Sequence, residues 1–383
     1  MPRTAKTSQT NDQDFLHRAV LRKVENDLVL YFFQNTKMST VLTIGDPHFQ
    51  ISNMDEVKQF SKACLTHART TRPHRIVVLG DVLHDHERVH STVLNVAVSF
   101  LNRLAEIAPT AVLVGNHDLI NNSQFLTENH WMNALKSNTN LTVVDKVVHT
   151  VWNGKKVIMV PFVPPGRFAE ALDTEGEWKD ADVIFAHQEF KGVKMGSIVS
   201  QDGDEWEEEW PFVVTGHIHQ NQTPQPNVYY PGSAIQVAFG ESEMNVVAEL
   251  DLNSIERSAV NEVDLGLTRK KILYTDSKSL KKIAKTVEPG GKHANHKLKV
   301  CVDGTKEEFK ALKKTAEFKR LQKKGVKIVY KRKRAAITAE NMAIVQAVEN
   351  QSGKGSSNFS EILCKIVAES SSQELKNAYK EII

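Results

Sequence analysis

Residues 75–81 read RIVVLGD, a short apolar run that stops at a glycine and a carboxylate. The same arrangement recurs at 41–46, VLTIGD, and at 111–116, AVLVGN, where a carboxamide replaces the carboxylate. Between these runs, the stretches at about 54–69 and 89–107 have the apolar spacing of helices. Strands that alternate with helices indicate βαβ units on a parallel sheet, so the sequence predicts an α/β protein.

Further along the chain, short apolar runs bounded by turn residues predict strands at 157–160, 183–185, 213–215 and 246–250. His187 follows the second of these, and His217 and His219 follow the third. Because alternate residues of an extended segment point to the same side, both imidazoles can face one ligand. Ligand sites of parallel sheets collect at the carboxyl ends of the strands, which is where all these polar residues stand.

The polar residues at these strand ends offer only oxygen and nitrogen ligands. That donor set suits a pair of Mn²⁺, Fe or Zn²⁺ ions, and the lack of a thiolate argues against a structural zinc site. Two metals about 3.5–4 Å apart can hold a phosphorus centre for in-line attack. A single Asp or His of this kind is more often a surface residue or a satisfied core residue. Five such motifs in order, each after an apolar run, instead favour a dinuclear metal site.

The overall composition bounds the class of protein. With 383 residues the chain can form a large core and one or two further modules. Cys64, Cys301 and Cys364 form no Cys-x-x-Cys pair, which indicates a reducing compartment without disulfides or a zinc ribbon. No apolar stretch approaches the roughly 18 residues of a membrane span, and the N-terminus lacks the pattern of a signal peptide. We expect a soluble, intracellular protein, cytoplasmic or nuclear, without a membrane partner.

Basic charge is concentrated in one region. Residues 269–334 contain 23 Lys and Arg against six Asp and Glu, a net charge of +17, so the rest of the chain carries −14. Strands at 297–302 and 325–330 around a helix at 307–324 predict a small β-α-β cap. Its basic surface is either a solvated, Lys-rich helix face or a binding surface for nucleic-acid phosphates. The candidates for DNA contact are Lys331, Arg332, Lys333 and Arg334.

Five segments follow from these patterns. They are an N-terminal extension (1–37), a metal-binding domain (38–266), the basic cap (267–334), a linker (335–357) and a helical segment (358–383). The last segment has the apolar spacing of two short helices, which cannot bury their apolar faces against each other alone. It packs either on its own domain or on a partner protein, with Ile362, Leu363 and Ile366 as the candidate anchors.

The chain resembles the calcineurin-like metallophosphoesterases, and more narrowly the nuclease subunit of the SbcC–SbcD type. Five motifs carry the resemblance: Asp46-Pro47-His48, Gly80-Asp81, Gly115-Asn116-His117-Asp118, Ala186-His187-Gln188-Glu189 and Gly216-His217-Ile218-His219. The segments Tyr230-Pro231-Gly232-Ser233 and Phe239-Gly240-Glu241 are similar to the SbcD-type nucleases in particular. The resemblance implies a core of two mixed sheets flanked by helices, followed by a β-α-β cap and a C-terminal helical pair.

The same resemblance implies roles for single residues. One metal would be held by Asp46, His48, Asp81 and His219, and the other by Asp81, Asn116, His187 and His217. His117 would be catalytic, stabilising charge at the scissile phosphate or protonating the leaving oxygen. His84 would be a second catalytic histidine near DNA, or else a surface residue at a helix start. Asp118 would orient His117 or cap the following turn.

The resemblance favours a Mn²⁺-dependent DNA endo/exonuclease, in which a hydroxide held between the two metals attacks phosphorus. It implies DNA and an SbcC-type, SMC-like ATPase as partners in double-strand-break repair or recombination, and a homodimer. Two alternatives remain. One is a small-molecule or nucleotide phosphodiesterase or phosphatase with the same metal motifs, and the other is a non-catalytic scaffold that binds DNA ends.

Overall fold

The computed structural model describes residues 39–86, 88–196 and 198–332, which divide into two compact units. The first unit comprises the described residues up to Ile272 together with Val287–Lys299. The second comprises Leu273–Thr286 and the described residues from Val300 onward. The two are described separately below.

The first sheet of the first unit has six strands in the order β14-β13-β1-β2-β3-β4. Strands β1 to β4 run parallel to one another, as the sequence predicts for the first three of them, while β13 and β14 are antiparallel additions at one edge. Their bounds are β1 (Thr40–Ile44), β2 (Arg75–Val78), β3 (Thr110–Leu113), β4 (Leu141–Val144), β13 (Val247–Asp251) and β14 (Val260–Val263).

The second sheet also has six strands, in the order β11-β12-β10-β7-β6-β5. Its four central strands are parallel and its two edge strands antiparallel, so both sheets are mixed and the predicted fold class is confirmed. The bounds are β5 (Val148–Trp152), β6 (Lys155–Val160), β7 (Val183–His187), β10 (Phe212–Gly216), β11 (Gln222–Gln225) and β12 (Val228–Tyr230). A separate hairpin is formed by β8 (Lys194–Met195) and β9 (Ile198–Val199).

The two sheets pack face to face, and their central strands are buried along almost their whole length because both faces of these strands are covered. On β2, Val77 lies in the core between the sheets with Phe185 of β7. Its neighbours Ile76 and Val78 belong instead to the core under the helices. A third core on the outer face of the second sheet contains Phe168, Trp178 and Trp206, and the partly buried Trp210 packs against it.

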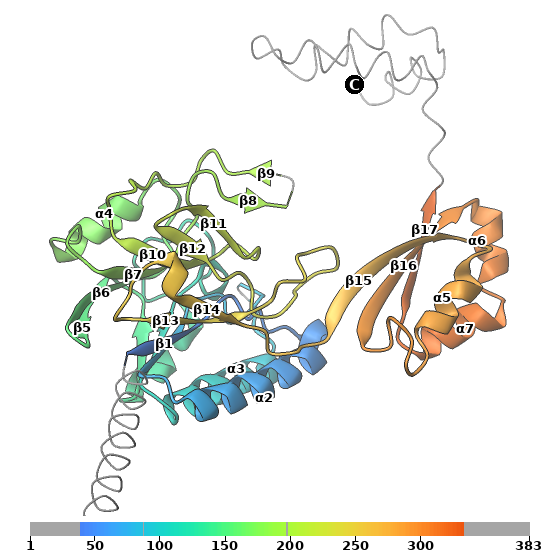
Figure 1. The fold of residues 1–383 in the computed structure, drawn as a ribbon, viewed down its shortest axis with the longest axis horizontal. Coiled ribbons are helices and arrows are strands. Elements are labelled where there is room, and N and C mark those ends of the chain that lie inside the picture. Colours follow the sequence, from blue (N-terminus) through green and yellow to red (C-terminus); the bar gives the residue numbers. More distant parts are fainter. Residues whose placement is uncertain (1–38, 87, 197, 333–383) are drawn as a thin grey trace, which may run out of the picture. The chain divides into compact units, whose positions relative to one another are not determined.

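Helices cover the outer faces of the sheets. Helices α2 (Met54–Thr71) and α3 (Ser91–Ala105) lie side by side along the first sheet (Figure 1). Phe60 and Phe100 are buried there, and each such side chain stabilises the fold by roughly 1.5–3 kcal/mol. The remaining elements are α4 (Phe168–Leu172) and five 3-10 turns, η1 (Ile51–Asn53), η2 (Asn116–Asp118), η3 (Trp131–Ser137), η4 (Asp173–Glu175) and η5 (Arg257–Ala259).

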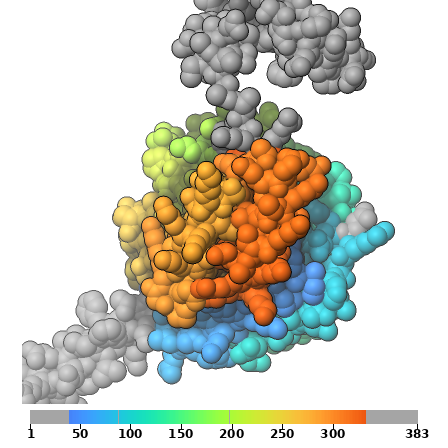
Figure 2. Space-filling model, turned by 90° about the vertical axis from the view of Figure 1, so that its right-hand side faces the viewer, coloured from blue at the N-terminus to red at the C-terminus, as the bar shows by residue number. Residues whose placement is uncertain are grey.

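The second unit is built on a three-stranded sheet in the order β15-β16-β17, and Figure 2 looks onto it. Its elements are β15 (Arg269–Asp276), α5 (Leu280–Thr286), β16 (His296–Gly304), α6 (Lys306–Leu312), α7 (Ala316–Lys323) and β17 (Lys327–Arg332). Strands β15 and β16 begin in the first unit and continue into the second. The sequence predicted the last two strands and missed the strand and helix that precede them.

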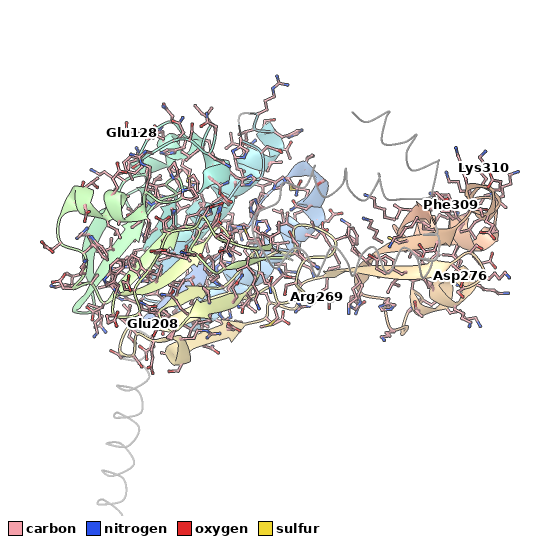
Figure 3. The ribbon with its side chains drawn as sticks, turned by 90° about the horizontal axis from the view of Figure 1, so that it is seen from above. Glu128, Glu208, Arg269, Asp276, Phe309 and Lys310 are labelled. Carbon is pink, nitrogen blue, oxygen red and sulfur yellow. The ribbon has the colours of Figure 1, made fainter. Side chains whose placement is uncertain are left out.

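The helix predicted at 307–324 is wrong as a single helix, because the chain forms α6 and α7 in its place. The hydroxyl of Thr315 accepts a hydrogen bond from the backbone N–H of Phe318 and so caps a new helix start. Phe309 of α6 packs edge-on against Phe318, with ring centroids 6.0 Å apart, while Lys310 points outward (Figure 3). The break therefore allows both short helices to contribute to one small core.

Several predicted segments lie outside the described residues. They are the N-terminal extension, the linker and the helical segment with Ile362, Leu363 and Ile366, together with Lys333 and Arg334 of the basic cluster. In the part of the chain that is described, no helix has the length and apolar character needed to cross a membrane.

Candidate metal centre

The carboxyl ends of five parallel strands bring the predicted ligands together. Strands β1, β2 and β3 of the first sheet lead into Asp46, Asp81 and Asn116. Strand β7 of the second sheet ends at His187, and the neighbouring β10 ends just before His217, with Gly216 paired to His187. Because the sheets are stacked, these strand ends form one polar cluster at the same edge of the first unit.

The backbone is strained at four of the predicted ligand positions. Asp46, His48, Asp81 and His217 have φ angles of 30°, 45°, 48° and 81°, values that L-residues rarely adopt. Such a residue costs on the order of 1–3 kcal/mol, and this strain persists where the surrounding structure enforces it, commonly at functional sites. The fold therefore holds these side chains in place at a cost to its stability.

Glycines next to the ligands allow the loops to approach one another. A Cβ atom at Gly115 would lie 2.2 Å from Asp81 Oδ1, and one at Gly80 would lie 2.4 Å from His187 Nδ1. Gly80 also has a φ angle of 105°, which only glycine adopts readily. The glycines in these motifs are thus required by the close contact between loops.

The first predicted ligand group is gathered around one point. His48 Nε2 lies 2.8 Å from His219 Nε2 and 3.4 Å from Asp81 Oδ2. Asp46 is fully buried, and neither of its carboxylate oxygens has a hydrogen-bond partner among the described residues. Asp46 Oδ1 lies 3.6 Å from His187 Nδ1, an ion-pair distance but not a hydrogen bond. A buried carboxylate without hydrogen bonds is costly unless a cation neutralises it, so the group has the donors and the charge that a divalent metal requires.

The second predicted group lies on the other side of Asp81. Asn116 Oδ1 is 3.1 Å from His187 Nε2 and 2.9 Å from His217 Nδ1. Asp81 Oδ1 is 3.4 Å from His187 Nε2, so the two oxygens of Asp81 face different groups. Asp81, His187 and His217 each present a ligand atom within 4.8 Å of the others. This arrangement fits a bridging carboxylate between two metals.

Electrostatics also indicate a cation site. Burial lowers the pKa of His48 well below its usual value and raises that of Asp46. His187 behaves in the opposite way: although burial opposes it, the charges of Asp81 and Asp46 raise its pKa to about 9. The two carboxylates hold a proton on an enclosed imidazole, which means that the site attracts positive charge. A pair of divalent cations would supply this positive charge, and their binding would displace the proton from His187.

Neighbouring groups fix the orientation of the histidine ligands. His187 Nδ1–H donates to the carbonyl oxygen of Leu79 at 2.6 Å, which leaves Nε2 for a metal. His219 Nδ1–H donates to Glu241 Oε1 at 3.1 Å in the same way. Metal-binding histidines are commonly oriented by such a second hydrogen bond. Sequence motifs gave Glu241 no role, because its contact with His219 arises only when the chain folds.

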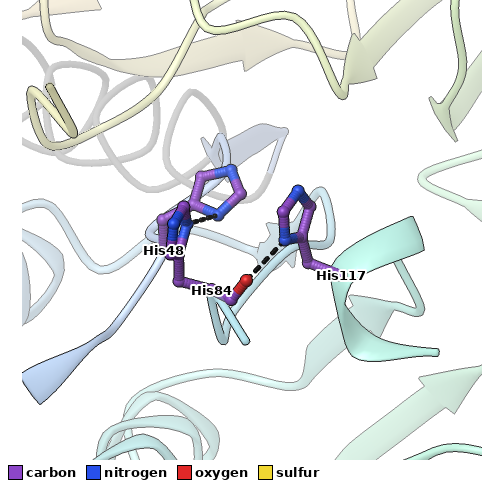
Figure 4. Close-up of side chains that lie close together, drawn as sticks. All are labelled: His48, His84 and His117. Atoms are coloured by element: carbon purple, nitrogen blue, oxygen red, sulfur yellow. Dashed lines mark hydrogen bonds between the residues drawn. The ribbon is translucent and has the colours of Figure 1, made fainter. Parts of the chain in front are cut away.

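His84 and His117 lie beside the predicted ligand His48 (Figure 4). His117 donates from Nδ1 to the carbonyl oxygen of His84 at 2.5 Å, and their rings are stacked with centroids 5.3 Å apart. His86, which the sequence motifs did not single out, stacks on His117 at 4.5 Å. His84 Nδ1 lies 3.3 Å from His48 Nδ1, so it supports a predicted ligand and does not mark a helix start.

Asp118 links the second and third motifs. Its carboxylate accepts hydrogen bonds from the backbone N–H groups of Val82, Leu83 and Gly115 and from the indole of Trp131. Burial, together with the charge of Asp81, raises its pKa. No hydrogen bond to the His117 side chain is among these, so its observed contacts are those of a residue that caps the turn.

Comparison with known proteins agrees with this geometry. Residues 39–221 match the family model of the calcineurin-like phosphoesterases. The chain is 40% identical over 354 residues to "Putative phosphoesterase 078R" of Invertebrate iridescent virus 3, an alignment that covers 90% of this chain and 96% of that protein. The chain belongs to the calcineurin-like phosphoesterase family.

A second relative of this phosphoesterase, "Putative phosphoesterase 244L" of Invertebrate iridescent virus 6, is 44% identical over 281 residues, which cover 72% of this chain and 97% of the relative. A solved phosphoesterase from E. coli, Yfce, covers 55% of this chain at 13% identity with a TM-score of 0.28, and no conclusion depends on that likeness. Membership of the family makes the chain a phosphoester hydrolase and implies divalent metals. Two groups of described residues present ligand atoms within 4.8 Å of one another: Asp81 with His187 and His217, and His48 with His84 and His117.

Proposed function

We propose that this phosphoesterase is a Mn²⁺-dependent DNA nuclease that acts in break repair or recombination. The proposal depends mainly on the second unit, a separate α/β fold that two continuous strands join to the phosphoesterase domain. This unit lies within residues 269–334, a region with a net charge of +17. A small substrate would need no such unit. Phosphates along a DNA strand are the ligand that a Lys- and Arg-rich surface recognises without regard to sequence.

Not every basic residue of this region is available to DNA. Lys270 is buried, and its ammonium donates to the carbonyl oxygens of Gln236 and Val237 at 2.6 and 2.8 Å. Lys297 donates to Glu56 at 2.7 Å. Both lie in the first unit and hold its structure together. The DNA surface therefore draws on the exposed lysines of α5 to α7 and on the cluster at 331–334.

The side chains of the site suggest how hydrolysis proceeds. When bound, two divalent cations neutralise phosphate oxygens and lower the pKa of water. Asp81 positions the two ligand groups relative to each other, and the neutral Asn116 adds an oxygen without adding negative charge near an anionic substrate. The Nδ1–H of His117 donates to the His84 carbonyl, so Nε2 is the ring nitrogen left to face the substrate. Only the doubly protonated ring carries a proton on Nε2, and in that form His117 can stabilise charge or pass this proton to the leaving oxygen.

The proposed partners are supported by sequence only. The resemblance to SbcD-type nucleases suggests an SMC-like ATPase partner and a homodimer, and the apolar spacing in 358–383 suggests a surface for the ATPase. An amphipathic helix pair of that kind fits the groove of a coiled coil. That segment lies outside the described residues, so the proposal depends on its sequence pattern alone.

The deciding experiment compares substrates. The full chain is stripped of metal, reloaded with Mn²⁺ or Mg²⁺, and assayed on linear and circular DNA, single- and double-stranded, beside a phosphomonoester. The proposal expects cleavage of DNA with Mn²⁺. Rapid hydrolysis of the monoester with intact DNA would support a small-molecule phosphatase instead. Tight DNA binding without hydrolysis of any ester would support the scaffold.

A further inference from the structure

A cavity of about 740 Å³ opens directly beside the predicted metal ligands. Three segments of the first unit line it: Lys194–Met195 with Gly196, residues 217–220, and residues 239–242. The middle segment carries His217 and His219. A group that occupies the cavity therefore lies next to a phosphate at the metals, close enough to belong to the same ligand. Its volume is typical of a pocket that holds an organic ligand.

The walls of the cavity are more apolar than the surroundings of a phosphate require. Met195 lines the cavity from the β8–β9 hairpin and is 38% exposed, and Ile218 lines it from the middle segment. Phe239 contributes an aromatic ring from the third segment. The hairpin is held in place because Lys194 N–H donates to Gln222 Oε1 at 2.8 Å and Gln222 Nε2 donates back to the Lys194 carbonyl at 2.9 Å.

Only a few polar side chains line the cavity. Gln220 offers an amide and Ser242 a hydroxyl, which can pair with the edge of a flat heterocycle, while Lys194 offers a cation. Glu241 also lines the cavity, but its carboxylate is already engaged with His219 and with the backbone N–H of Ala238. An apolar site with a few hydrogen-bonding groups and one cation, next to a phosphate site, matches a nucleotide.

We propose that this cavity binds the nucleobase next to the scissile phosphate, with Phe239 and Met195 packing against the face of the base. Every base has an apolar face, so such contacts are tolerant of sequence. A base held in this way is unstacked from its neighbours, which makes single-stranded DNA or a frayed end the preferred substrate. The inference depends on the proposed function in taking a nucleic-acid phosphodiester as the ligand at the metals.

The test measures binding and needs no turnover. The Mn²⁺-loaded full chain is titrated with AMP and with ribose 5-phosphate, which has the same sugar and phosphate but no base, and the nucleotide is checked afterwards by chromatography. Phe239→Ala and Met195→Ala are compared with Phe239→Tyr, which keeps the aromatic ring. Val151→Ala removes an apolar side chain that is 64% exposed on β5 and serves as the control.

The wild type is expected to bind AMP about five- to 150-fold more tightly than ribose 5-phosphate, the range that base stacking provides. Phe239→Ala and Met195→Ala should reduce that ratio and leave the affinity for ribose 5-phosphate unchanged, while Phe239→Tyr and Val151→Ala retain it. Equal affinities in the wild type would overturn the inference, and so would a variant that weakens both ligands equally.

The DNA assay separates this inference from the proposed function. If the protein prefers AMP but leaves all DNA substrates intact, the base pocket is supported and the nuclease function is rejected. If the protein cleaves DNA but binds AMP and ribose 5-phosphate with equal affinity, the nuclease function is supported and the base pocket is rejected.

Discussion

Asp118→Asn is the substitution whose effect follows most directly from the structure. Each carboxylate oxygen of Asp118 accepts two hydrogen bonds: Oδ1 from the Leu83 N–H and the Trp131 indole at 3.3 and 2.8 Å, and Oδ2 from the Val82 and Gly115 N–H groups at 3.3 and 3.1 Å. An asparagine has the same shape but only one accepting oxygen. Whichever way its amide is turned, two buried N–H donors face an NH₂ group.

Those two donors set the size of the expected effect. A buried donor without a partner costs about 1–3 kcal/mol, so the expected loss of stability is about 2–6 kcal/mol. That is a large share of the roughly 5–15 kcal/mol that stabilises a typical domain. Two effects oppose it, because a neutral side chain avoids the cost of burying a charge and removes repulsion from the nearby Asp81 carboxylate. Bound metals would neutralise Asp81 and so weaken this compensation.

The assay is urea unfolding of wild type and variant, each with and without Mn²⁺. Asp182→Asn is the matched control: it is the same chemical change at a carboxylate that is 32% exposed, pairs with Lys155 on the surface and accepts one backbone N–H, from Lys156. The single oxygen of an asparagine can still accept that N–H, so a change below about 1 kcal/mol is expected. The loss in Asp118→Asn should be larger with Mn²⁺ present. If Asp118→Asn loses no more stability than Asp182→Asn, Asp118 does not link the two motifs in the way inferred above.

Four further predictions concern other parts of the chain. His117→Ala should keep both metals by elemental analysis but lose roughly 10²–10³-fold in cleavage rate, whereas Asp81→Ala should lose metal; equal metal loss in both refutes the assignment. Neutralising the basic cluster at 331–334 should flatten the salt dependence of duplex binding, by about 0.9 in log–log slope for each phosphate that is no longer neutralised; an unchanged slope means a merely solvated surface. Deleting 358–383 should leave a folded, active enzyme that no longer co-purifies with an ATPase; an unfolded product assigns the segment to the core. Burial raises the pKa of the Cys64 thiol to about 12, so iodoacetamide at pH 8 should label it, by peptide mass spectrometry, only after unfolding; rapid labelling of the folded chain contradicts its burial.

The central strands could be predicted from sequence because apolar residues, many of them β-branched, form short runs in them. The run at 76–79 is apolar on both faces, and both faces prove to be buried, between the sheets and under α2 and α3. The edge strands were harder to recognise. Val148–Trp152 alternates between exposed and partly buried residues, and Gln222–Gln225 is almost entirely polar, so neither has the pattern of a core strand.

The motif residues could be predicted to converge because each follows a strand. The residues that support them could not. Glu241 reaches His219 across 22 positions of sequence. For Asp118 the sequence predicted a capping role but not its contact with Leu83, 35 positions away. His86 stacks on His117 from a loop that carries no motif at that position. Such contacts depend on how two loops meet in space, and no local periodicity records that.

Whether this phosphoesterase is a two-metal nuclease is decided by measuring metal content and activity in one sample, with closed circular single-stranded DNA as the substrate. We expect about two Mn²⁺ ions per chain, the stoichiometry of a two-metal site, and conversion of the circle to linear and shorter products. Activity should disappear when the metal is removed and return when it is added back. A sample that carries two metals and hydrolyses a small phosphoester, yet leaves the circular DNA intact, would contradict the nuclease assignment.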